Sequence, residues 1–200
     1  PSGGGEDSTP DATSKPQGLS IGDTAATDKA EFVLKEFEFT NGLYNSSNDL
    51  TKHLIPLTDE EIDALDSGVY QTDDGKVLAY MEFTIKNTGK TKLENCWVKT
   101  EDGHTSYVGG YVELDYNDYL FRALDDNGFM IDITAIEKGH TTFIGNNSTL
   151  ELDVLEDAHT YRGCIKVPEQ VMNDTDKSLS INIYLPCENG EFETFTYKIR

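Results

Sequence analysis

The stretch Lys76–Lys90, KVLAYMEFTIKNTGK, decides the fold of this chain because its apolar and polar side chains alternate almost without interruption. A period of two is the pattern of a β-strand with one face buried. Asn87-Thr88-Gly89 then supplies the residue types that end a strand in a turn. We expect this stretch to be the central strand of a β-sandwich. The apolar face consists of Val77, Ala79, Met81, Phe83 and Ile85.

Other stretches show the same alternation and are bounded by Gly, Pro, Asn or Asp. Together they predict an all-β fold, a sandwich of two antiparallel sheets with one short helix in an insertion. The apolar phase changes between Leu34 and Phe37, which predicts a β-bulge or a strand shared between two sheets. The stretches lie at about 31–39, 93–100, 105–114, 129–133, 150–154, 161–167, 179–185 and 195–199.

Asp102-Gly103 separates two of these stretches and is a strong signal for a two-residue hairpin. Such a turn places Val98 opposite Tyr107 and Trp97 opposite Val108, pairs that suit one pleated face. Trp97 is the single tryptophan of the chain, and we expect it to anchor the core.

The last hairpin, around Asn189-Gly190, requires a different turn. A two-residue turn there sets a threonine opposite Leu185 and mixes polar with apolar side chains on one face. A slip of one residue turns every side chain over, so core burial should determine the register. We therefore expect a three-residue loop or a bulge, with Leu185 opposite Phe195 and Ile183 opposite Tyr197.

Residues 1–18, PSGGGEDSTPDATSKPQG, contain no Val, Ile, Leu, Met or aromatic residue. Burial therefore cannot offset the entropy lost on ordering them, and we expect a flexible tether. The remaining residues, 19–200, are long enough for one well-formed core and are expected to form a single domain.

Residues 41–75 interrupt the strand rhythm and are expected to form an insertion in this domain. Thr58 is a good N-cap and Glu61 completes a capping box with it. These signals predict a short surface helix near 59–66 that packs on the sandwich.

The charge of the chain limits its partners. Asp and Glu number 37 against 16 Lys and Arg, which gives a net charge of −21 and a pI near 4.3. Nucleic acid and anionic membrane surfaces repel such a chain, so we expect no nucleic-acid partner. No run approaches the roughly 18 apolar residues of a membrane-spanning helix.

The chain has three cysteines, Cys96, Cys164 and Cys187. An odd and sparse set is not a disulfide scaffold. Two outcomes remain open from the sequence: one disulfide with one free thiol, or no disulfide. No pair has the Cys-x-x-Cys spacing of a metal or redox site.

Motifs for catalysis are missing or incomplete. Gly89-Lys90-Thr91 resembles the end of a phosphate-binding loop, but the required first glycine is Thr84 and no helix signal follows. Neither Gly-x-Ser-x-Gly nor Ser-x-x-Lys occurs. With 37 acidic residues, a pair of carboxylates will lie close by chance, so a hydrolase is the least favoured function. We expect no catalytic residue and no cofactor.

Metal ligands are also not indicated by spacing. The four histidines are scattered, and none has a second His or Cys at the spacing of a zinc site. The Asp-rich turns do not fit the calcium-binding loop of an EF-hand. An irregular oxygen site is the alternative to a solvated turn, and the solvated turn is favoured, so we expect no metal. The turn residues concerned are Asp73, Asp74, Asp125 and Asp126.

The strongest surface candidate is a group of tyrosines between residues 107 and 121. Exposed tyrosine beside Asp and Asn suits recognition of sugars or protein segments, because the ring offers area and the hydroxyl offers a hydrogen bond. The alternative is that these tyrosines fill the edge of the sandwich or pack under the insertion. The candidate ligand-binding residues are Tyr107, Tyr111, Tyr116 and Tyr119.

Several short motifs together resemble a bacterial family. Ile21-Gly22-Asp23-Thr24 precedes the first strand, Ile85–Gly89 ends the central strand, and Asp102-Gly103 forms a hairpin. Tyr161-Arg162-Gly163 then leads into Ile165–Pro168. The chain resembles, over about residues 21–200, the immunoglobulin-like domains of bacterial secreted lipoproteins, a family of mostly unassigned function. That family is similar in fold to the mycobacterial immunoprotective extracellular antigen.

The resemblance implies an immunoglobulin-like sandwich, export, and a lipid anchor on an N-terminus that precedes this chain. It transfers no catalytic residue, and the 41–75 insertion and the 115–149 region depart from the family pattern. We therefore expect an extracellular, non-catalytic interaction module on the outer face of a bacterial cell membrane. Its expected partner is an unidentified protein or a cell-wall glycan, and the alternative is a glycan or small-ligand binding domain that uses the four tyrosines.

Overall fold

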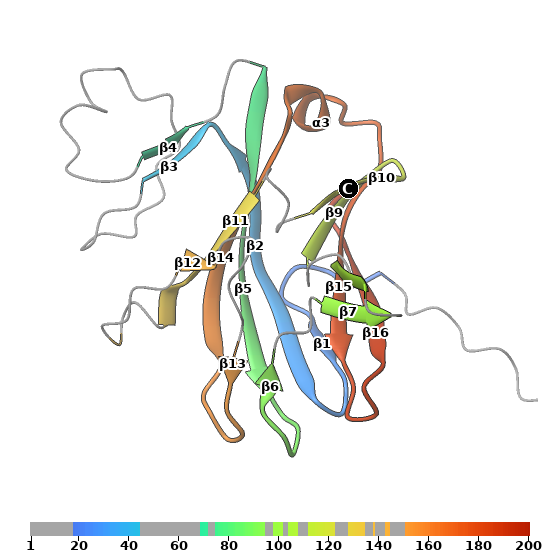
Figure 1. Cartoon of the computed structure of the whole chain (residues 1–200). Helices are drawn as coiled ribbons and strands as arrows, with labels where there is room; N and C mark the ends of the chain where they lie inside the picture. The colour runs from blue at the N-terminus through green and yellow to red at the C-terminus, as the bar shows by residue number, and fades with distance from the viewer. Residues whose placement is uncertain are drawn as a thin grey trace, which may run out of the picture.

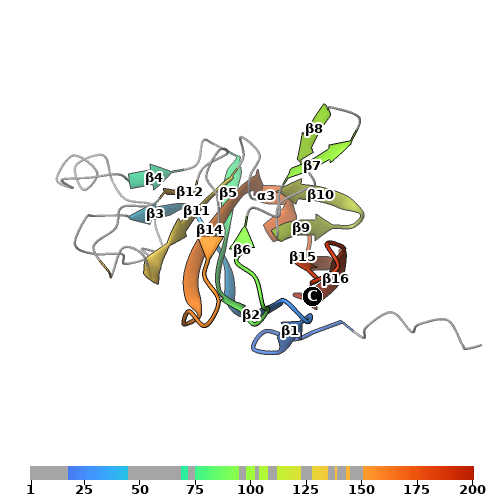
Figure 2. The same ribbon diagram turned by 60° about the horizontal axis from the view of Figure 1, so that its bottom comes forward.

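Two antiparallel sheets pack face to face around one apolar core in this computed structural model. The described residues are 18–44, 69–71, 75–94, 98–101, 104–107, 112–122, 128–134, 138, 143–144 and 151–200. Figures 1 and 2 show β2, β5 and β14 in one layer and β9, β15 and β16 in the other. The predicted two-sheet antiparallel β-sandwich is confirmed.

The larger sheet has six strands in the order β1-β2-β5-β14-β11-β12. Its middle strands are long and its edge strands are short, an arrangement that limits unpaired sheet edges. The strands are β1 Thr24–Ala26, β2 Ala30–Thr40, β5 Lys76–Asn87, β14 His159–Pro168, β11 Gly128–Asp132 and β12 Phe143–Ile144.

The smaller sheet has four strands in the order β10-β9-β15-β16. Three pairs of short strands stand apart from both sheets: β6 with β13, β3 with β4, and β7 with β8. A short helix, α3 (Glu169–Asn173), follows Pro168 at the end of β14. The remaining strands are β9 Val112–Tyr116, β10 Tyr119–Arg122, β15 Leu179–Pro186, β16 Phe192–Lys198, β6 Leu93–Glu94, β13 Glu151–Leu152, β3 Gly42–Tyr44, β4 Val69–Gln71, β7 Val98–Glu101 and β8 His104–Tyr107.

Strand β5 lies between β2 and β14 in the larger sheet, as expected for a central strand. Its predicted apolar face is buried in the core, with Phe83 stacked between Phe32 of β2 and Tyr161 of β14 at ring distances of 4.9 and 5.5 Å. The expectation of a half-buried strand is wrong for its first half, because Leu78 and Tyr80 on the opposite face are also buried. Burial raises the pKa of Tyr80 above its usual range.

A β-bulge at Lys35 explains the change of phase in β2. The pairing of β2 with β5 slips by one residue between Leu34 and Glu36, so Lys35 has no partner of its own. The side chains on both sides of the bulge therefore face the same core, with Phe32 and Leu34 before it and Phe37 and Phe39 after it. The predicted bulge is confirmed, and it turns an irregular sequence pattern into one continuous apolar face.

The hairpin of β7 and β8 has the predicted register. Val98 lies opposite Tyr107 and Glu101 opposite His104, which leaves Asp102-Gly103 as the connection. Trp97 and Val108 lie outside the described residues. Within the described parts of the longer strands predicted around this hairpin, 93–100 and 105–114, strands cover Leu93–Glu94, Val98–Glu101, His104–Tyr107 and Val112–Tyr116.

The hairpin of β15 and β16 has the predicted loop length but a different register. Cys187 N donates to Glu191 O at 2.8 Å, and Gly190 N donates to Cys187 O at 3.0 Å, so three residues form the loop. Gly190 takes a φ of +85°, which glycine adopts most readily. Ile183 pairs with Phe195 rather than with Tyr197, as we expected, so the pairing is wrong by two residues. A shift of two keeps the same faces inward, and the apolar pattern therefore cannot distinguish the two registers.

The predictions for the N-terminal tether and for the insertion fall mainly outside the described residues. Residues 1–17 of the tether, most of the 41–75 insertion and its predicted helix near 59–66 are not described. The flanks of the insertion are described, and there β3 pairs with β4. Of the cysteines, Cys164 and Cys187 are free thiols, and Cys96 is not described. Among described residues the outcome is therefore no disulfide.

Three turns and strand β13 are joined by hydrogen bonds at one end of the sandwich. Thr88 N and Gly89 N both donate to Lys29 O, at 3.0 and 3.1 Å. Lys90 N donates to the carboxylate of Glu188 at 2.6 Å, and Glu188 N donates to Asp28 Oδ1 at 2.8 Å. Asn87 Nδ2 reaches Leu152 O of β13 at 2.9 Å. These bonds connect the turn after β5 to the turn of β1 and β2, to the turn of β15 and β16, and to β13.

The substitution Gly89→Ala tests this packing of turns. A Cβ at this position would lie 2.3 Å from Glu188 Oε1, 2.9 Å from Lys29 Cγ and 3.2 Å from Lys29 Cα. The backbone of the Lys29 turn must shift, and we expect a loss of about 1–2 kcal/mol in the free energy of unfolding. Urea unfolding measures it. Thr88→Ala is the control, because Thr88 is exposed and its backbone bond to Lys29 is kept. Equal stabilities of the two variants would contradict the expectation.

Candidate functional site

Two of the four candidate tyrosines meet at the end of the β9–β10 hairpin. Tyr116 and Tyr119 are directly opposite each other across the two-residue turn Asn117-Asp118. Both turn residues have positive φ, +47° and +68°, as a type I′ turn requires. Asp118 N donates to Asp115 Oδ1 at 3.0 Å, and Asn117 N donates to Ser178 O at 3.1 Å, so the turn is held from both sides.

Tyr119 is the exposed tyrosine of this pair. Its side chain is 64% exposed, and its ring lies 4.8 Å from the ring of Phe121 at an angle of 56°. Tyr119 and Phe121 are two residues apart on β10, so they share one face of the strand. The neighbouring Leu120 is 43% exposed. The tip of the hairpin therefore presents the Tyr119 ring to solvent, while Phe121 beside it is half-buried against the core.

Tyr116 is half-buried and forms a hydrogen bond with an acid from another element. Its hydroxyl donates to Asp174 Oδ2, just beyond α3, and Gln170 Nε2 of α3 reaches the same oxygen at 3.1 Å. The bond to Asp174 raises the pKa of Tyr116, and bonds from Tyr116 and Gln170 lower the pKa of Asp174. This contact fixes the base of the hairpin to α3.

The structure describes the strands of three of the four candidate tyrosines and places them in two different sheets. Tyr107 belongs to β8, in a two-stranded sheet separate from β9 and β10, where it pairs with Val98. Tyr111 lies outside the described residues. The same is true of the candidate ligands of an irregular calcium site, Asp73, Asp74, Asp125 and Asp126. The aromatic site that the structure supports therefore consists of Tyr116, Tyr119 and the additional residue Phe121.

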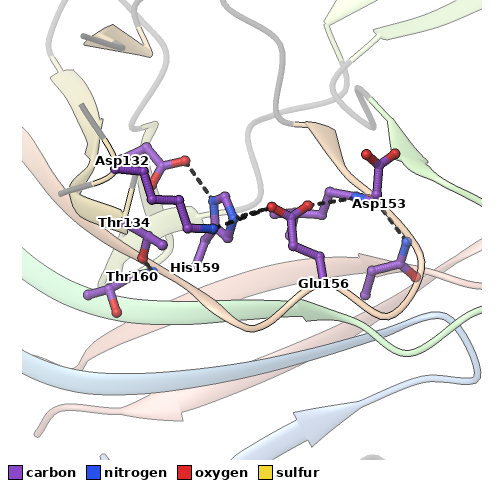
Figure 3. A network of polar contacts seen from close by, with 9 residues as sticks. Asp132, Thr134, Asp153, Glu156, His159 and Thr160 are labelled. Carbon is purple, nitrogen blue, oxygen red and sulfur yellow. Dashed lines mark hydrogen bonds and ion pairs between the residues drawn. The ribbon is translucent and has the colours of Figure 1, made fainter. Parts of the chain in front are cut away.

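A second polar site, missed by the sequence analysis, surrounds His159 at the start of β14. Its Nδ1 lies 2.9 Å from Asp132 Oδ2 at the end of β11, and its Nε2 lies 2.9 Å from Glu156 Oε1 in the turn after β13 (Figure 3). Asp132 and His159 are both buried, at 7% and 6% exposure. Thr134 Oγ1 accepts a bond from Thr160 N at 2.8 Å beside them.

The donors and acceptors of this site match one protonation state of the histidine. Ionised carboxylates only accept hydrogen bonds, so an imidazole that meets two of them is satisfied at both nitrogens when it carries both protons. Each bond is then charge-assisted. Both ring nitrogens of His159 lie 2.9 Å from a carboxylate oxygen, which leaves neither nitrogen available to a substrate or metal. Within the described ranges, no group of three or more His, Cys, Asp and Glu side chains is arranged to hold a metal ion.

Tyr161 forms the apolar wall of this polar site. Its ring lies 6.2 Å from that of His159 with an angle of 30° between the planes, and its side chain is buried. Burial, and then the nearby Asp132 carboxylate, raise the pKa of Tyr161 far above its usual range. The phenol is therefore neutral at physiological pH.

Sequence spacing offered little that would reveal the His159 site. Asp132 is 27 residues from His159, and the pairing of β11 with β14 brings the two together. Glu156 and His159 are close in sequence, but no His or Cys lies at metal-ligand spacing. The one local signal in the sequence is a histidine at the start of an apolar strand, with an acid three residues before it. That signal does not define a chemical activity.

We expect Tyr116→Phe to change the acid titration of Asp174. Loss of the Tyr116 bond lets the pKa of Asp174 rise toward its ordinary value. A carboxyl with a depressed folded pKa stabilises the fold above its unfolded pKa of about 3.9, and this contribution disappears as pH falls through the folded value. The stability difference between wild type and variant should thus be present at pH 7 and vanish at strongly acidic pH. Carboxyl-carbon NMR and urea unfolding measure both effects, and Tyr119→Phe, without this bond, is the control.

No helix in the described parts of the chain is long and apolar enough to cross a membrane. No protein-family model matches the sequence, and no curated protein matches it either. The named bacterial lipoprotein family and the mycobacterial antigen thus gain no support from these comparisons.

Solved structures match the fold. An uncharacterized β-sandwich protein of Clostridium difficile 630 is 22% identical, with a TM-score of 0.53 over 96% of this chain and 100% of the other. A conserved hypothetical protein of Bacillus anthracis is 14% identical, with a TM-score of 0.47 over 92% and 99%. A candidate lipoprotein of Bacillus subtilis is 14% identical, with a TM-score of 0.36 over 88% of this chain and 38% of the other. The first match places the chain among β-sandwich proteins.

Proposed function

We propose that this chain is a non-catalytic, extracellular interaction module, tethered to a cell surface, that binds through the tip of the β9–β10 hairpin. The observation that carries the proposal is the exposed ring of Tyr119, which rests beside the half-buried ring of Phe121. Large aromatic side chains gain much contact area on binding and lose little conformational entropy. An aromatic ring that is 64% exposed on a sheet hairpin is suited to that role.

The setting of the pair is rigid, which favours binding because little has to be ordered when a partner arrives. Strand β9 pairs with β10 on one side and with β15 on the other. The Tyr116 hydroxyl, bonded to Asp174, ties the hairpin to the segment after α3. The tip is thus held at fixed distance from the core, while Tyr119 itself is free to meet a ligand.

The His159 site supports a non-catalytic function. A general base needs a free nitrogen within hydrogen-bond reach of its substrate. His159 is buried and directs both nitrogens at carboxylates, so both nitrogens are occupied by contacts within the fold. The net charge of −21 further favours a neutral or basic partner over nucleic acid.

A cell-wall glycan is the second candidate partner, and the composition of the hairpin favours it. The rings of Tyr119 and Phe121 offer an apolar surface on which a sugar ring packs. The carboxylates of Asp115 and Asp118 flank the same turn, and carboxylates accept hydrogen bonds from sugar hydroxyls. Aromatic faces beside acids therefore suit a glycan as well as a protein segment.

Binding to purified cell walls tests the proposal. We expect the chain to sediment with Gram-positive cell walls, and Tyr119→Ala to weaken this binding at least about tenfold, as for a central interface residue. Phe192→Ala is the matched control, because Phe192 is an exposed aromatic (40%) on β16 rather than on the hairpin. Treating the walls with protease distinguishes the partners: binding to a glycan survives, and binding to a wall protein is lost.

Equal losses in Tyr119→Ala and Phe192→Ala would place binding elsewhere and overturn the hairpin site. Tyr119→Phe refines the result, since it keeps the ring and removes the hydroxyl. Retention of binding in this variant assigns the contact to stacking, and its loss assigns it to the hydroxyl.

A further inference from the structure

The turn between β13 and β14, residues 153–158, has an unusual exposed tip. Leu155 is 94% exposed and Val154 is 38% exposed. Leu155 also has a φ of +68°, a left-handed conformation that is unfavourable for a residue with a Cβ. An exposed leucine gains nothing from core packing, so contacts elsewhere in the turn must hold this conformation.

Glu156 provides those contacts. Its backbone N donates to Asp153 O at 3.3 Å, and one oxygen of its carboxylate accepts a bond from Asp153 N at 2.9 Å. The other oxygen, Oε1, meets His159 Nε2 at 2.9 Å. Figure 3 shows the Glu156 side chain between Asp153 and His159. The carboxylate therefore closes the turn and fastens it to the start of β14.

The charged groups around His159 come from three parts of the fold. Asp132 approaches from β11 and Glu156 from the turn, while Lys138 lies 3.7 Å from Glu156 Oε1. Tyr161 is the titratable neighbour on β14. On the β5 side the paired residue is Ile85, which does not titrate. When the imidazole carries two protons, it donates to both carboxylates.

A neutral imidazole has one N–H and can donate to only one of the two carboxylates. Asp132 is buried, and a hydrogen bond to a buried carboxylate is more costly to lose than one to a carboxylate that water can reach. The Glu156 side chain is 30% exposed and has Lys138 and water as alternative partners. The remaining proton therefore stays on Nδ1 toward Asp132, and the bond to Glu156 is the one that breaks.

We propose that His159 is a proton-controlled clamp on the 153–158 turn. In its doubly protonated state it holds Glu156 and fixes the Val154–Leu155 tip in its left-handed conformation. Loss of one proton releases Glu156 and lets the tip move. The clamp rests on the geometry of three elements and is independent of the proposed binding function at the β9–β10 hairpin.

Limited proteolysis and NMR of the full chain test the clamp. NMR of the imidazole carbons follows the titration of His159 directly between pH 5 and pH 9. Chymotrypsin cleavage after Leu155 reports opening of the turn, with each rate divided by that for a free peptide of residues 151–159 at the same pH. We expect the normalised rate to rise about tenfold, as for loss of one charge-assisted hydrogen bond, with the midpoint at which His159 loses its proton.

Two variants separate the clamp from a general effect of charge. Glu156→Gln should show no pH response, because an amide both donates and accepts and so bonds either form of the imidazole. Asp157→Asn removes the same charge from the next, exposed residue and should keep the wild-type response. A flat wild-type profile, a midpoint unrelated to His159, or a wild-type response in Glu156→Gln would each overturn the proposal.

Discussion

Burial of the side chains along β5 is the constraint on which the rest of the sandwich depends. Strands β2 and β14 pair with it on either side, and its inward face meets the smaller sheet through the shared core. Each large apolar side chain buried there contributes about 1.5–3 kcal/mol. The bulge at Lys35 serves the same constraint, because without it Phe37 and Phe39 would point away from this core.

Beyond the core, polar contacts arrange the parts that face solvent. At one end of the sandwich, Asn87, Gly89 and Glu188 join turns that are far apart in sequence. Beside them, His159 joins β11, β14 and the turn after β13 through buried and half-buried carboxylates. Buried charges are stable only when they are paired, so this site has to keep its partners to keep its shape. The fold thus combines an apolar core with polar contacts that hold its loops in place.

The two candidate sites differ in what they present. The β9–β10 hairpin offers an exposed tyrosine ring on a supported turn, which is the character of a binding surface. The His159 site buries His159 and Asp132, while Glu156 and the apolar tip of its turn reach solvent. The two proposals assign the sandwich a place for a partner at the hairpin and a proton-sensitive contact at His159, and each can be tested by substitutions outside the core.

Local sequence patterns determined where the strands lie, but not which strands far apart in the sequence pair with each other. Alternation in 76–90 identified β5 and its core face, the phase change revealed the bulge, and Asp102-Gly103 gave the register of β7 and β8, because each depends on neighbours in sequence. Which strands pack together decides the register of β15 and β16 and the burial of Tyr80. It also decides that Tyr107 and Tyr119 lie in different sheets. Strand pairing likewise brings together Asp132 and His159, which are 27 residues apart. Only the tertiary structure brings such residues into contact, because sheet pairing, and not spacing along the chain, sets their distance.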